Sequence, residues 1–86
     1  MDATRTNNET GSVDTEQQIF QKAFGEHLAV LRKKSGFTQE QLAHEVGLHR
    51  TYIGFIEQGK RNPTIGTMYR ISKVLDIELR KFFPPA

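Results

Sequence analysis

The chain has 86 residues, no cysteine and a formal net charge of +2. That length supports one small domain with one modest core, and the lack of cysteine excludes a disulfide framework and a thiolate metal site. The longest apolar runs are far too short to span a bilayer and the N-terminus lacks signal-peptide regions, so we expect a cytoplasmic protein without a membrane partner.

The charge is divided unevenly along the chain. Residues 1–18 hold one basic and four acidic side chains, for a net charge of −3, whereas residues 19–86 hold 11 basic and six acidic ones, for +5. A basic globular part is compatible with a module that binds phosphates.

Residues 1–14 are polar, and Val13 is the only larger aliphatic residue after Met1. Such a segment cannot bury enough apolar surface to offset the entropy lost on ordering, so we predict a disordered acidic tail. The globular domain is then predicted over residues 15–86.

A long helix is predicted over residues 15–35. Thr15 and Gln18 have the spacing of an N-terminal capping box, and Gly36 follows as the residue that ends the helix. Apolar residues recur along it at helical spacing: Ile19, Phe20, Ala23, Phe24, Leu28 and Leu31.

Residues 38–59 are predicted to form two short helices joined by a tight turn. Thr38 and Gln41 provide a capping box for the first helix, and Gly47 ends it, because a left-handed residue is needed there. The second helix is predicted over about residues 50–58. Two helices around a short turn with a glycine make a helix-turn-helix unit.

The second of these helices has two chemically different sides. At about 100° per residue, Ile53 and Ile56 fall together on one side. The opposite side carries a cation, a hydroxyl, an aromatic ring, an amide and a gap, namely Arg50, Thr51, Phe55, Gln58 and Gly54. Arginine can bind guanine O6 and N7, threonine can reach base edges, and an apolar group can contact the thymine methyl. This side therefore suits readout of a DNA major groove; an ordinary solvated face is the alternative.

Two further helices complete the predicted fold. The first begins at Pro63 and Thr64 and continues to Leu75, and a final one covers residues 78–83, where Leu79, Phe82 and Phe83 are apolar. Five helices without a strand predict an all-α fold.

No pattern in the sequence indicates a catalytic or metal site. The three histidines, His27, His44 and His49, have neither cysteine partners nor i, i+4 spacing. Ser35 and Ser72 lack a base and an acid around them, and there is no glycine-rich phosphate loop. We therefore expect no enzymatic activity, no cofactor and no metal.

The run from Leu31 to Ile77 resembles the phage repressor/Cro-type (XRE-like) helix-turn-helix family of bacterial transcription regulators. The matching motifs are G-x-T-Q-x-x-L-A, the glycine turn, I-x-x-I-E-x-G and N-P-T-I. The resemblance covers about residues 24–83 and implies a compact, lambda-repressor-like DNA-binding domain. The R-T-Y-I, I-E and R-N segments resemble the small controller proteins of restriction–modification systems.

The resemblance implies roles for individual residues. The helix that begins near Arg50 would be the recognition helix, and Arg32 and Glu57 would form a structural ion pair. Bases would be read by Arg50, Thr51 and Phe55, and phosphates contacted by Gln39, Lys60, Arg61 and Asn62. Gly54 and Phe55 depart from the family, whose members often carry polar residues there.

Two further residues are predicted at the DNA interface from their positions alone. His49 precedes the recognition helix and is placed to donate to a phosphate or a base. Tyr52 lies on the flank between the two sides of that helix, with a phosphate contact and a place at the core edge as equal alternatives.

We predict that the protein binds double-stranded DNA sequence-specifically, as a homodimer on a two-fold operator, and acts on transcription by blocking or recruiting RNA polymerase. Aromatic and apolar residues of the last two helices are the predicted dimer surface, with core closure as the alternative: Tyr69, Leu79, Phe82 and Phe83. A function of another class is an antitoxin that sequesters a partner protein and autoregulates through DNA binding.

Overall fold

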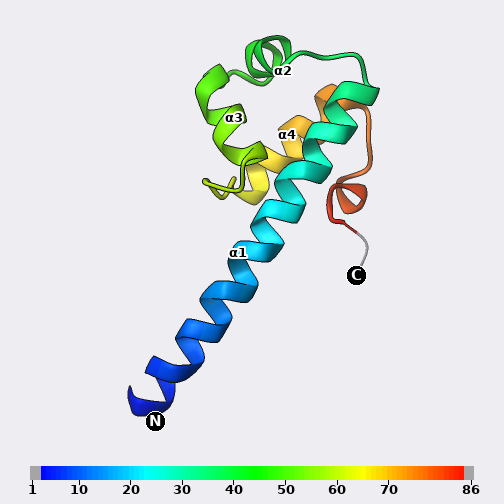
Figure 1. Ribbon diagram of the computed structural model, residues 1–86. Coiled ribbons are helices and arrows are strands. Elements are labelled where there is room, and N and C mark those ends of the chain that lie inside the picture. The colour runs from blue at the N-terminus through cyan, green and yellow to red at the C-terminus, as the bar shows by residue number, and fades with distance from the viewer. Residues whose placement is uncertain (1–2, 85–86) are drawn as a thin grey trace.

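Four α-helices and one 3-10 helix make up the described part of the chain (Figure 1). The structure is a computed structural model that describes residues 3–84, with side chains described from residue 14 onward. The elements are α1 (Ala3–Lys34), α2 (Gln39–Val46), α3 (Arg50–Glu57), α4 (Ile65–Leu75) and η1 (Leu79–Phe82). No strand occurs among these residues, and none of the helices in the described range is both long and apolar enough to cross a membrane.

The prediction of five α-helices was wrong at the last element. Residues 78–83 form a single 3-10 turn, in which Lys81 N–H donates to the Glu78 carbonyl at 2.9 Å. Asp76 before it is left-handed, with φ 59°, and Pro84 follows it. The few residues between these two points can close i→i+3 bonds but cannot extend an α-helix.

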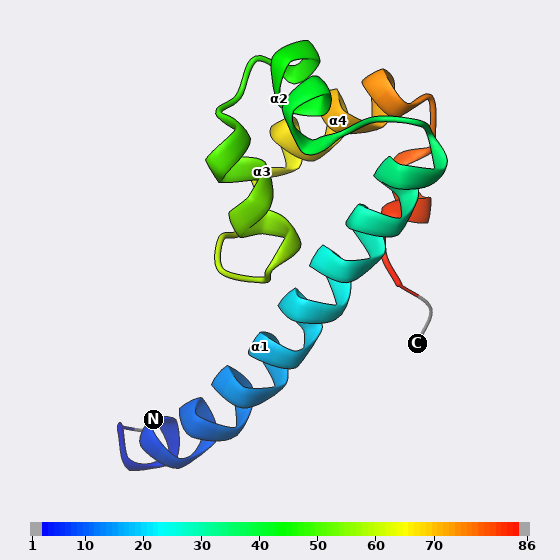
Figure 2. The ribbon, with the colours of Figure 1, turned by 45° about the horizontal axis from the view of Figure 1, so that its top comes forward.

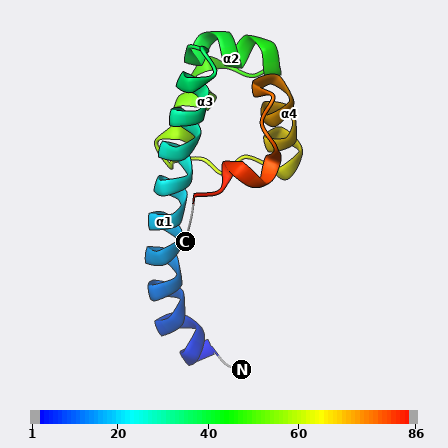
Figure 3. The same cartoon turned by 90° about the vertical axis from the view of Figure 1, so that its right-hand side faces the viewer.

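The start of α1 also differs from the prediction, because the helix begins at Ala3 and not near Thr15. Thr15 lies inside the helix, so the predicted Thr15–Gln18 capping box was wrong. Residues 3–14 contain no proline, and a helix that is already nucleated adds one backbone bond for each residue it gains. Figures 1 and 3 show this segment extending away from the other helices. Residues 1, 2, 85 and 86, at the ends of the predicted tail and domain, lie outside the described residues.

One core is formed where all four α-helices and η1 meet. Its buried apolar residues are Phe24, Leu28, Leu42, Ala43, Val46, Ile53, Ile56, Met68, Ile71, Leu75 and Phe82. Ile19 and Phe20, predicted on the same stripe of α1, are 66% and 49% exposed. They lie near the point where α1 leaves the domain, so the predicted apolar stripe extends beyond the part of α1 that packs against the core.

Phe82 was predicted at the dimer surface, and this was wrong. Its side chain is 0% exposed, and η1 packs against both α1 and α4. A chain of this size has few large side chains with which to close its core, and the phenylalanine of the last turn fills the space between the two helices.

The predicted helix-turn-helix is present as α2, a turn and α3. Thr38 Oγ1 accepts from the Gln41 N–H at 3.0 Å, and Gln41 Oε1 accepts from the Thr38 N–H at 2.9 Å, which is a complete capping box. Gly47 ends α2 with φ 83°. In Figure 3, α2 crosses the end of the domain above α3 and α4, and it contacts both.

α1 and α3 approach each other backbone to backbone at Gly25. A Cβ atom at Gly25 would lie 2.5 Å from the carbonyl oxygen of Glu57 and closer still to that of Ile56. One turn away, Gln21 Nε2 donates to the carbonyl of Gly59 at 3.2 Å. Figure 2 shows the end of α3 lying beside this part of α1. The α1 backbone therefore sets the position of α3.

We predict that Gly25→Ala destabilises the domain although alanine is the better helix former. The added methyl must push α1 and α3 apart, at a cost of about 1–3 kcal/mol, which exceeds the propensity gain of about 1 kcal/mol. Chemical denaturation measures the change in the free energy of unfolding.

The matched control is Gly66→Ala in the first turn of α4. The nearest heavy atom to a Cβ there is Thr64 Oγ1 at 3.8 Å, so the control should unfold at the wild-type denaturant concentration or above it. Equal stability of the two variants would contradict the close contact.

Candidate nucleic-acid interface

The outward side of α3 carries the residues predicted to read bases. Ile53 and Ile56 are buried in the core, whereas Arg50 and Thr51 are exposed. His49, at the N-cap of α3, is also exposed and makes no side-chain cap hydrogen bond. A cation, a hydroxyl and an imidazole are thus grouped at the N-terminal end of this helix.

Phe55 lies on the same side but is not fully exposed. Its side chain is half-buried, and the Arg61 guanidinium carbon lies 5.9 Å from the centre of its ring. This distance is typical of a cation–π contact. The ring therefore holds Arg61, a predicted phosphate contact, against the end of α3.

The loop after α3 begins with a tight backbone turn. Gly59 has φ 77°, and the Lys60 N–H donates to the Phe55 carbonyl at 2.8 Å. Lys60 and Arg61 are exposed next to the C-terminal end of α3. Asn62 is exposed too, but it borders a small apolar cavity with Phe20, Phe24, Pro63 and Met68, so it lies closer to α1 than the sequence suggested.

Tyr52 is half-buried and packs against the core. Of the two alternatives left open for this residue, the structure supports a place at the core edge.

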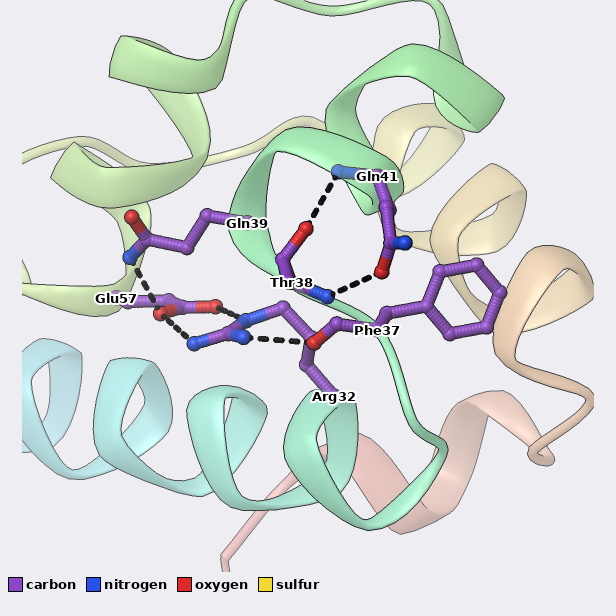
Figure 4. Close-up of polar contacts among 6 residues, drawn as sticks. All are labelled: Arg32, Phe37, Thr38, Gln39, Gln41 and Glu57. Carbon is purple, nitrogen blue, oxygen red and sulfur yellow. Dashed lines mark hydrogen bonds and ion pairs between the residues drawn. The ribbon is translucent and has the colours of Figure 1, made fainter.

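Arg32, Glu57 and Gln39 form a polar network beneath this surface (Figure 4). Arg32 Nε donates to Glu57 Oε2 at 2.6 Å, and Arg32 Nη2 donates to Glu57 Oε1 at 3.0 Å. The third nitrogen, Nη1, donates to the Phe37 carbonyl at 2.8 Å. The ion pair implied by the resemblance is therefore present, and it joins α1, α3 and the segment before α2.

The Arg32–Glu57 pair is almost removed from solvent. The two residues are 6% and 8% exposed. Charges at such positions are tolerated only when they are paired and hydrogen-bonded, because each has lost its hydration. Here the guanidinium is bonded through all three of its nitrogens, and both carboxylate oxygens accept.

Gln39, at the N-terminus of α2, is oriented by the same carboxylate. Its Nε2 donates to Glu57 Oε1 at 2.9 Å, and this amide nitrogen carries a second N–H. The N–H groups of a helix N-terminus and this amide are donors of the kind that a phosphate oxygen requires. Gln39 also borders an open groove with Lys33, Glu40 and Arg50, so the hydrogen-bond donors of Gln39, Lys33 and Arg50 lie around one groove together with one carboxylate.

The predicted dimer residues do not form one uniform surface. Tyr69 and Phe83 are 53% and 42% exposed, and the Phe83 ring lies 5.7 Å from that of Phe24. Leu79 is half-buried and shares a shallow groove with Tyr69. Figure 3 shows α4 and η1 at the opposite side of the domain from α3.

The residues of α1 that position α3 were not identified from the sequence. Gln21 and Gly25 lie within the helix predicted over residues 15–35, but Gly25 lies directly against the last residues of α3 and Gln21 donates to the Gly59 carbonyl just after it. A glycine inside an otherwise regular helical pattern is the available signal, since it often marks a close packing contact.

A family model described as helix-turn-helix matches residues 28–82. The control protein C.BamHI from Bacillus amyloliquefaciens is 45% identical over 56 residues, which cover 64% of this chain and 69% of that protein. The crystal structure of the restriction-modification controller protein C.AhdI from Aeromonas hydrophila has a TM-score of 0.74 and 38% identity, over 77% of this chain and 96% of that one. The structure of SinR, the master regulator for biofilm formation, in complex with DNA has a TM-score of 0.65 and 28% identity, over 69% of this chain and 95% of that one.

We predict that Glu57→Gln costs about 3 kcal/mol of stability, because it leaves the buried Arg32 guanidinium without a counter-charge. Urea denaturation followed by circular dichroism measures the loss. The control is Glu78→Gln, which breaks the exposed Arg80–Glu78 pair and should change stability by less than about 0.5 kcal/mol. Losses of equal size would show that the buried pair has no special weight.

Proposed function

The chain belongs to the XRE-like helix-turn-helix family of DNA-binding transcription regulators, and we propose that it acts as a homodimeric controller on a two-fold operator. In this proposal α3 enters the major groove, with Arg50 and Thr51 against base edges. Gln39, Lys60, Arg61 and Asn62 contact phosphates. His49, at the start of α3, contacts a phosphate or a base.

One observation carries the proposal: α3 is fixed to the core on one side and exposes polar side chains on the other. α3 is held by buried Ile53 and Ile56, and the Arg32–Glu57 pair ties its C-terminal end to α1. Arg50 and Thr51 remain exposed on the other side. Base discrimination requires such a rigid support, because a hydrogen bond to a base edge is lost when the helix shifts by an ångström or so.

Three arguments favour a dimer. A single module buries little surface on DNA, and members of this structural class normally grip two half-sites about 34 Å apart. Exposed Tyr69 is in α4 and exposed Phe83 follows η1, and aromatic residues are enriched at protein interfaces. A dimer through α4 and η1 would leave both copies of α3 free for DNA.

The similarity to C.BamHI and C.AhdI supports a controller of a restriction–modification system over an antitoxin. As a regulator that works by occupancy, the protein would block or recruit RNA polymerase according to the position of its operator. A neighbouring methylase or endonuclease gene would agree with the controller role, and a neighbouring toxin gene would contradict it.

We predict different effects for the base-reading and phosphate-contacting residues on the operator selected from random duplex DNA. Arg50→Ala should cost about 1–3 kcal/mol and relax the base preference at one position in each half-site. Lys60→Ala should weaken binding to all duplexes alike and lower the slope of log K against log salt by about one. Titrations at several salt concentrations measure both. An Arg50→Ala variant with wild-type affinity and preference would contradict the assigned role.

We predict that the free protein sediments as a dimer at micromolar concentration and that Tyr69→Asp makes it a monomer, since the carboxylate would be desolvated in the interface. Ile19→Asp is the control, because Ile19 is also a large exposed hydrophobic residue, 66% exposed, but lies outside the proposed surface. A wild-type monomer, or a dimer that persists in Tyr69→Asp, would contradict the proposed dimer surface.

A further inference from the structure

Gly54 lies where a glycine is costly, in the middle of the eight-residue helix α3. A glycine inside a helix lowers stability by about 1 kcal/mol relative to alanine, because it loses more backbone freedom on folding. Because α3 has only eight residues, this cost is large relative to the stability of the helix. Some compensating benefit should therefore exist at this position.

The domain itself supplies no such benefit. The glycines with positive φ in the described range are Gly36, Gly47 and Gly59, and Gly54 is not among them. A Cβ at Gly54 would meet no heavy atom closer than the Gln39 amide at 3.9 Å, whereas a Cβ at Gly25 would collide with backbone. Neither conformation nor packing thus demands a glycine at position 54.

The position faces outward, among the residues that would contact DNA. Gly54 is one turn after Arg50 and one turn before Gln58, and both of these side chains are exposed. The amides of Gln39 and Gln58 lie at the rim of the gap, 3.9 and 4.0 Å from the Cβ position. The Cα of Gly54 is therefore uncovered by a side chain of its own, and the nearest atoms around the open Cβ position belong to two amides.

We propose that Gly54 is a specificity-determining residue whose missing side chain leaves room for the C5-methyl group of one thymine in each half-site. The inference rests on the proposed function. Thymine is the base that presents an apolar group in the major groove, and a glutamine amide suits adenine N6 and N7. The uncovered Cα of Gly54 beside the Gln58 amide therefore matches an A·T pair.

The test adds one methyl group to the protein, removes one methyl group from the DNA, and combines the two changes. Wild-type protein and Gly54→Ala are titrated with the selected operator, and with duplexes in which each thymine in turn is replaced by deoxyuridine, which lacks the methyl group. The wild-type protein should lose about fourfold in affinity at one thymine per half-site, the value of one buried methyl group. Gly54→Ala should bind the thymine operator about tenfold more weakly than wild type, because the two methyl groups compete for one space.

The decisive result is the combination of both changes. Gly54→Ala should recover relative to wild type on the deoxyuridine duplex: its loss against wild type should shrink from about tenfold on the thymine operator to about threefold or less, since only one methyl group then occupies the space. A purely structural role for Gly54 predicts no such recovery.

Gly66→Ala is the matched control, because it also replaces a helical glycine at which an added Cβ meets no close neighbour. Both alanine variants should raise the melting temperature, and only Gly54→Ala should change DNA binding. This separates helix stability from recognition.

Each outcome bears on the inference. Equal affinity of Gly54→Ala and wild type on the selected operator would overturn it. So would a weaker affinity that no deoxyuridine substitution restores, because that result would assign the glycine to close approach of the sugar–phosphate backbone. A wild-type protein that selects no duplex would overturn the proposed function itself, which is a separate and recognisable result.

Discussion

The buried ion pair between Arg32 and Glu57 is the interaction on which the rest of the arrangement depends. It lies where α1, α3 and the segment before α2 come together, and its bonds reach all three. A charged pair with so little solvent tolerates few alternative geometries, because any shift would leave a desolvated charge poorly bonded. The same Glu57 carboxylate also accepts from Gln39. The network that fixes α3 therefore also orients the Gln39 side chain at the N-terminus of α2.

α3 contributes residues both to the core and to the exposed surface, and most of its eight residues belong to one or the other. The isoleucines contribute to the apolar core, Glu57 to the polar network, and Arg50 and Thr51 to the exposed edge. Phe55 belongs to neither group completely, since its ring supports Arg61. A helix this short is not stable alone, so its conformation is a property of the whole domain, and the recognition surface inherits the stability of the core.

The helix-turn-helix was predictable because its signals are local. The capping box at Thr38 and Gln41 and the left-handed Gly47 are determined by neighbours in sequence, and the side of α3 that holds Ile53 follows from helical periodicity. The start of α1 was not predictable in this way, because a helix that packs at one end can continue through residues with no apolar pattern. The burial of Phe82 depends on how α1 and α4 diverge, and the position of Arg61 depends on the Phe55 ring. Neither relation can be inferred from the spacing of residues along the chain.

Contact between main chains at Gly25 has a consequence for how such a protein can diverge. Beside the side chains that hold α3, the carbonyl groups of Ile56 and Glu57 lie directly against the bare helix surface at Gly25 and limit how close α3 can come to α1. Under the proposed function, substitutions along the outer edge of α3 would alter which bases are preferred while this main-chain contact stays in place. In that proposal the orientation of α3 and its base preference depend on different residues, so a change at a single surface position would suffice for a new operator.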